Sequence, residues 1–117
     1  MILNVSRDTT VATSARMARS LWARFCGLML QSPDEFQPGS GLIIDPCSSI
    51  HMFFMRFPID VLYMSADHKV VRLHKAIKPW RIGPLHTRGA RYVIELPCGS
   101  VRASGTAVGD QLKIQAT

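Results

Sequence analysis

The chain consists of short apolar segments separated by Gly, Pro, Asp and Ser, and several of these segments alternate apolar with polar residues. Such alternation is typical of β-strands, because successive side chains of a strand point to opposite faces of a sheet. It predicts one hairpin with its turn at residues 7–9 and another with its turn at residues 65–68. In the second hairpin Val71, Leu73 and Ile77 form the predicted inward side. The predicted strands are residues 2–5, 10–17, 41–44, 50–57, 59–64, 70–77, 91–96, 100–103 and 111–115.

Two segments depart from simple alternation. Ser20 is the predicted N-cap of a short helix in which Leu21, Phe25 and Leu28 share one face. Residues 50–57 are apolar at nearly every position, a pattern that predicts a strand buried on both faces.

About eight strands and one short helix predict a mainly β fold, a compact jelly-roll-like sandwich or a partly open barrel, because a single sheet could not cover both its faces. The 117 residues, 47% of them hydrophobic, are enough for one domain, which we expect to span residues 1–117. No apolar run approaches the roughly 18 residues that a membrane span requires. The N-terminus carries its first charges after a very short apolar stretch, unlike a secretory signal. We therefore expect a cytoplasmic location and no membrane partner.

The number and spacing of the cysteines and the distribution of charge limit the classes of function that the sequence supports. Cys26, Cys47 and Cys98 are odd in number and lack CxxC spacing, so neither a disulfide framework nor a standard zinc motif is predicted. The net charge is +6, and no acidic residue lies between Asp67 and Glu95. That interval contains Lys69, Arg72, Lys75, Lys78, Arg81, Arg88 and Arg91. Such a segment generates a positive field that attracts anions.

The densest apolar segment, residues 41–60, also contains the polar residues Cys47, His51, Arg56 and Asp60. A buried polar group without a partner costs about 1–3 kcal/mol, so these residues mark the predicted site. Cys47 and His51 could serve as nucleophile and base, although four residues of extended chain hold them roughly 13 Å apart.

Structural roles compete with these chemical ones. His51 could simply satisfy nearby backbone groups, and Arg56 could form an ion pair with Asp60 or Glu95. A metal bound by Cys47, His51 and Asp60, with His74 or His86, has suitable ligand types but no compact ligand spacing. We therefore expect neither a metal nor a cofactor. Trp80, in the irregular basic segment 78–90, could stack on a ligand or cap the core.

Several motifs together carry a family resemblance. They are Gly41-Leu-Ile-Ile, Pro46-Cys-Ser-Ser-Ile-His51, Met55-Arg-Phe-Pro-Ile-Asp60, Pro79-Trp-Arg81, Val93-Ile-Glu-Leu-Pro97 with Gly99, and Val108-Gly-Asp110. In order and spacing they resemble the domain-of-unknown-function family 192, also called the uncharacterised protein family 127. The resemblance implies a compact β-rich, jelly-roll-like domain without an agreed biochemical activity.

Three functions follow as hypotheses. The preferred one is a non-catalytic binding module whose pocket is framed by His51, Arg56, Asp60, Trp80 and Arg81 and takes a small anionic or polar ligand or a protein partner. The second is a nucleic-acid binder that uses the basic segment 69–91, with Trp80 as a stacking platform; it is less favoured because interleaved aromatic residues are missing. The third is a hydrolase or lyase in which His51 is the base, Asp60 orients it and Arg56 binds an oxyanion.

Overall fold

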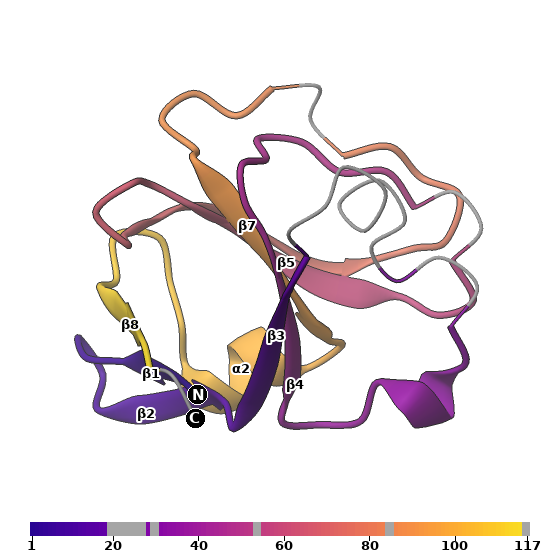
Figure 1. The fold of residues 1–117 in the computed structure, drawn as a ribbon, viewed down its shortest axis with the longest axis horizontal. Helices are drawn as coiled ribbons and strands as arrows, with labels where there is room; N and C mark the ends of the chain where they lie inside the picture. The colour runs from indigo at the N-terminus through magenta and orange to yellow at the C-terminus, as the bar shows by residue number, and fades with distance from the viewer. Residues whose placement is uncertain (19–27, 29–30, 53–54, 84–85, 116–117) are drawn as a thin grey trace.

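The computed structural model describes residues 1–18, 28, 31–52, 55–83 and 86–115 (Figure 1). The strands in this part of the chain are β1 Ile2–Asn4, β2 Thr9–Ala12, β3 Ser14–Ala18, β4 Ser40–Ile44, β5 Ile59–Met64, β6 Val70–Ile77, β7 Tyr92–Pro97 and β8 Leu112–Ile114. The helical elements are the 3-10 turn η1 Pro33–Glu35 and the short helix α2 Ser100–Ser104. The predicted mainly β class is therefore confirmed.

The described strands form two sheets and do not close into a barrel (Figure 1). The smaller sheet has the order β2-β1-β8 and the larger one the order β3-β4-β7-β5-β6. Strands β3 and β4 run parallel, whereas every other neighbouring pair is antiparallel. Strand β6 is thus an edge of the larger sheet, and the irregular chain after it lies at that edge.

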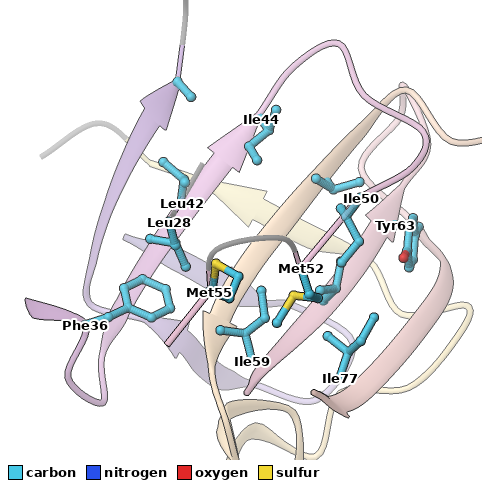
Figure 2. Packing of buried hydrophobic residues seen from close by; sticks show 13 residues of the cluster. Leu28, Phe36, Leu42, Ile44, Ile50, Met52, Met55, Ile59, Tyr63 and Ile77 are labelled. Atoms are coloured by element: carbon cyan, nitrogen blue, oxygen red, sulfur yellow. The ribbon is translucent and has the colours of Figure 1, made fainter. Parts of the chain in front are cut away.

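Alternation along the strands separates two cores, one on each face of the larger sheet. Leu42, Val61 and Val93 point into the first core, while their neighbours on the strands point into the second. The smaller sheet and α2 contribute to the second core. Segments outside the strands contribute Ile50, Met52 and Met55 to the first core, and Figure 2 shows these side chains beside the sheet residues.

Both predicted hairpins form, but their details differ from the prediction. Strands β1 and β2 pair as predicted, yet the second arm ends at Ala12, because the backbone N–H groups of Thr13 and Ser14 both donate to Gly39 O at 2.9 Å. The chain crosses there to the larger sheet. In the second hairpin the register shifts between Tyr63 and Met64, so Val71 packs on the first core and Leu73 on the second, while Ile77 is buried as predicted.

Two predicted strands are wrong and one predicted helix is not covered. The described parts of the predicted strand 50–57, residues 50–52 and 55–57, are not in a strand, and His51 makes an isolated bridge to Ile82. Residues 100–103 form α2, whose first N–H groups are held by a buried carboxylate described below. The helix predicted from Ser20 lies outside the described residues, apart from Leu28, which is buried in the first core.

Candidate ligand-binding site

Two irregular segments, residues 50–52 and 80–83, pair with each other beside the edge strand β6. The contacts are the His51–Ile82 bridge and the backbone hydrogen bonds Met52 N to Arg81 O (2.7 Å), Trp80 N to Met52 O (2.7 Å) and Gly83 N to Ile50 O (3.0 Å). A Cβ added to Gly83 would lie 2.9 Å from Ile50 Cγ1 and 3.0 Å from the Tyr63 hydroxyl. Only glycine fits this close approach, which seats the pair against the first core.

Asp60 holds the neighbouring backbone in place from the inside. Its side chain is 1% exposed, and its two oxygens accept hydrogen bonds from the N–H groups of Ala76 (2.8 Å), Gly99 (3.1 Å) and Val101 (3.0 Å). Ala76 has φ +52, a left-handed conformation that is unfavourable for alanine. The carboxylate therefore fixes an irregular end of β6 and the start of α2, which explains why residues 100–103 are helical.

A hollow of about 400 Å³ opens at this irregular end of β6, and we call it the basic hollow. It is lined by His74, Ala76, Ile77, Lys78, Arg81 and Ile82. The side chains of its lining that can carry charge are all basic, so it suits an anion. A second hollow, of about 310 Å³, lies between β2 and α2 and has no charged residue in its lining.

Trp80 lies in the chain between Lys78 and Arg81, two residues that line the basic hollow, and its backbone is left-handed. Residues Lys78 to Arg81 form a turn closed by a 3.4 Å hydrogen bond from Arg81 N to Lys78 O, with Pro79 second and Trp80 third at φ +66. This is the pattern of a type II turn, whose third position favours glycine. A left-handed conformation costs any other residue about 1–2 kcal/mol. Trp80 is nevertheless 58% exposed, so little core burial offsets that cost.

The structure brings three of the five predicted binding residues together. His51, Trp80 and Arg81 belong to the paired segments, and Asp60 lies behind Ala76 as a structural anchor. Arg56 is exposed, and the ion pairs among the described residues are Arg7–Asp110 and Arg91–Asp45. The expected Arg56–Asp60 pair does not form there.

Arg81 is the one residue of the predicted pocket in this lining, and five lining residues were missing from the prediction: His74, Ala76, Ile77, Lys78 and Ile82. Lys78 belonged to the basic segment identified in the sequence, but its place beside Arg81 depends on the turn at Trp80. The sequence suggested His74 only as a possible metal ligand and gave no signal for Ile82, because their places in the hollow depend on the β5–β6 register and on the bridge to His51.

Three buried side-chain atoms have no hydrogen-bond partner among the described residues: Tyr63 Oη, Thr87 Oγ1 and Glu95 Oε1. Burial raises the pKa of Glu95 to about 7, although the positive charge of Arg16 opposes the shift. Burial likewise raises the pKa of Tyr63 to about 12, with Arg72 opposing it and Cys47 and Glu95 adding to it. Glu95 is thus a carboxyl group that holds its proton near neutral pH.

The described residues support a cysteine nucleophile or a metal site less well than they support an anion site. The Cys47 thiol donates to Ser49 O at 2.7 Å. Cys47 is half-buried and Cys98 is exposed, and neither of these two cysteines is part of a disulfide. No cluster of three or more His, Cys, Asp or Glu side chains gathers among the residues described. In the same part of the chain, no helix has both the length and the apolarity to cross a membrane.

Known proteins share sequence and fold with this chain. The UPF0127 protein of Pyrococcus furiosus is 32% identical over 117 residues, which cover 96% of either chain. A crystal structure of a protein of unknown function from Novosphingobium aromaticivorans matches with a TM-score of 0.75 at 23% identity, covering 86% of this chain and 74% of that one.

A second crystal structure, of a candidate transcription regulator from Sinorhizobium meliloti 1021, matches with a TM-score of 0.76 at 24% identity, covering 96% and 88% of the two chains. At these identities the two structures establish the fold alone. The family described as "Uncharacterized ACR", DUF192, matches residues 2–114. Because this match spans nearly the whole sequence and the archaeal relative supports it, the chain belongs to the DUF192 family, also named UPF0127.

Proposed function

We propose that the protein is a non-catalytic binding module that takes a small anionic ligand in the basic hollow. The observation that carries the proposal is the lining itself, in which His74, Lys78 and Arg81 are the side chains able to carry charge. The nearest buried carboxylate, Asp60, is already engaged with three backbone N–H groups. Its charge is therefore directed toward the backbone and away from a ligand.

The site is also rigid where a ligand would contact it. The turn from Lys78 to Arg81 is tied to Met52 on both sides, through Trp80 N to Met52 O and Met52 N to Arg81 O, each 2.7 Å. Asp60 fixes the backbone of Ala76, another residue of the lining. Preorganised donors bind an anion with less loss of conformational freedom than mobile side chains do.

The test is isothermal titration calorimetry with inorganic phosphate at constant ionic strength. The variant Lys78→Ala with Arg81→Ala is compared with a matched control, Arg102→Ala with Lys113→Ala, which removes the same charge from exposed positions on α2 and β8. We expect the first variant to weaken phosphate binding about tenfold or more, and the control to change it less than about twofold. Equal losses in both variants would show that only net charge matters and would refute the site.

A cytoplasmic location and a single working unit over residues 1–117 are part of the proposal. Cys47 and Cys98 are thiols outside any disulfide, as is typical of proteins in a reducing compartment. The hydrolase or lyase alternative needs Asp60 to orient His51. Three backbone hydrogen bonds already engage the Asp60 oxygens, so the binding role is the better supported one.

A further inference from the structure

The basic hollow is larger than a simple anion needs. Its volume is about 400 Å³. One water molecule takes up about 30 Å³ of the liquid, so inorganic phosphate or a small carboxylate fills only part of the hollow. Pockets that enclose whole organic molecules have volumes of about 300–1,000 Å³. The hollow therefore has room for a second part of the ligand, joined to the anionic group.

The rest of the lining shows what that second part is. Ala76, Ile77 and Ile82 line the hollow together with its basic side chains. Ile77 belongs to the first core and is 3% exposed, so the hollow extends down to the apolar core. Ile82 is 58% exposed and adds apolar surface that a ligand can cover. An apolar group in the hollow would remove this surface from water, which is favourable.

Resting on the proposed anion site, we propose that its ligand is an aliphatic anion, with a carboxylate or phosphate group on Lys78 and Arg81 and a hydrocarbon chain against Ile77 and Ile82. Each of these two cations is next in sequence to an isoleucine of the lining, Lys78 to Ile77 and Arg81 to Ile82. One short molecule can therefore contact a cation and an apolar side chain together. A short fatty acid and an alkyl phosphate present this same chemistry.

Other classes of ligand use only part of the lining. Inorganic phosphate would bind to Lys78 and Arg81 and leave the apolar surface of Ile82 in water. An uncharged hydrocarbon would leave the two cations without a counter-charge. A sugar phosphate would place hydroxyl groups against Ile77 and Ile82, where a polar group without a partner costs free energy. The combination of cations and isoleucines therefore favours an aliphatic anion.

The test is a ¹H–¹⁵N titration of the labelled protein at constant pH and ionic strength, followed at the backbone amides of Ile77 and Ile82. The probes are acetate, butanoate, hexanoate, hexyl phosphate and uncharged 1-hexanol. A fully buried CH₂ group strengthens binding about fourfold, and a half-buried one about twofold. We expect hexanoate to bind about tenfold more tightly than acetate. It should also bind about tenfold more tightly than 1-hexanol, which lacks the charge.

A pair of matched variants tests the contact with the chain. Ile82→Thr keeps a β-branched side chain but removes apolar surface from the lining. Val108→Thr is the control, because Val108 is 60% exposed and lies outside the lining. We expect Ile82→Thr to reduce the preference for hexanoate over acetate about threefold or more and to leave acetate binding unchanged. The control should keep the wild-type preference.

The outcomes separate this inference from the anion site itself. Equal binding of acetate and hexanoate, with both weakened in Lys78→Ala with Arg81→Ala, overturns the aliphatic inference and leaves the anion site intact. A preference for hexanoate that is the same in Ile82→Thr and Val108→Thr also overturns it. Unchanged binding of both phosphate and hexanoate in Lys78→Ala with Arg81→Ala overturns both proposals. Where the preference depends on Ile82, tighter binding of hexyl phosphate assigns a phosphate head group, and tighter binding of hexanoate a carboxylate.

Discussion

Glu95 makes the stability of the protein depend on pH in a direction that can be calculated. It lies on the central strand β7, between Leu42 of β4 and Val61 of β5, and it is 4% exposed. Burial raises its pKa from 4.5 to about 7 in the folded state. The folded protein therefore binds a proton more tightly than the unfolded chain, and this contribution to stability is present in full below about pH 4.5.

As the pH rises from about 4.5 to 7, the contribution of Glu95 is lost, and above pH 7 the loss levels off. The shift in pKa corresponds to a loss of about 3 kcal/mol in the free energy of unfolding. Glu95→Gln removes the titration and keeps the size of the side chain. We expect the variant to equal the wild type in stability near pH 4.5 and to exceed it by about 3 kcal/mol at pH 8.5.

Urea unfolding between pH 4.5 and 8.5, followed by circular dichroism, measures this difference. Other groups titrate in the same interval, but they cancel when the variant is subtracted from the wild type. Glu35→Gln is the matched control, because Glu35 is the other glutamate of the chain and is exposed. A difference between Glu95→Gln and wild type that stays constant with pH would refute the reasoning, since it would mean that Glu95 titrates alike in both states.

Three further substitutions test the scaffold of the site by urea unfolding. Asp60→Ala should lower the free energy of unfolding by about 3 kcal/mol, because three backbone N–H groups lose their acceptor. The control Asp34→Ala, at an exposed position, should change it by less than about 0.5 kcal/mol. Similar values for the two variants would contradict the anchoring role of Asp60. Gly83→Ala should cost about 1–3 kcal/mol, because its Cβ would approach Ile50 Cγ1 to 2.9 Å, and an unchanged stability would mean that the paired segments are loose. Trp80→Gly should stay within about 1 kcal/mol of wild type, since glycine relieves the φ +66 strain, while a loss of 3 kcal/mol or more would identify Trp80 as a core residue.

Much of the fold could be predicted because the alternation of apolar and polar residues is a local property. Strand β6 and the turn at residues 65–68 follow from it, whereas β5 and β7 are short, mostly apolar segments between turn residues and are buried at every position. The errors have non-local causes. Residues 100–103 were predicted as a strand. In the structure the carboxylate of Asp60, some 40 residues earlier, accepts hydrogen bonds from the N–H groups at the start of α2, and these residues are helical. No pattern within α2 reveals that contact.

In the candidate site, too, local features could be predicted from the sequence and features that depend on distant contacts could not. The charge pattern predicted a positive segment that includes Lys78 and Arg81, and both line the basic hollow. The prediction of an Arg56–Asp60 ion pair was wrong. It relied on the short distance between the two residues along the chain, but the buried carboxylate of Asp60 accepts hydrogen bonds from the backbone and does not pair with Arg56. The left-handed conformation of Trp80 was not predicted, since the sequence Pro79-Trp80 does not specify a turn that normally takes glycine third.

The location of the anion is the most direct test of the proposed function. In a ¹H–¹⁵N correlation spectrum, titration with inorganic phosphate should shift the backbone amides of Ala76, Lys78 and Arg81, which line the basic hollow. The amides of Val11 and Cys98, which line the uncharged hollow between β2 and α2, should not move. Shifts confined to this second hollow, or no shifts that saturate, would contradict the assignment of the basic hollow as the binding site.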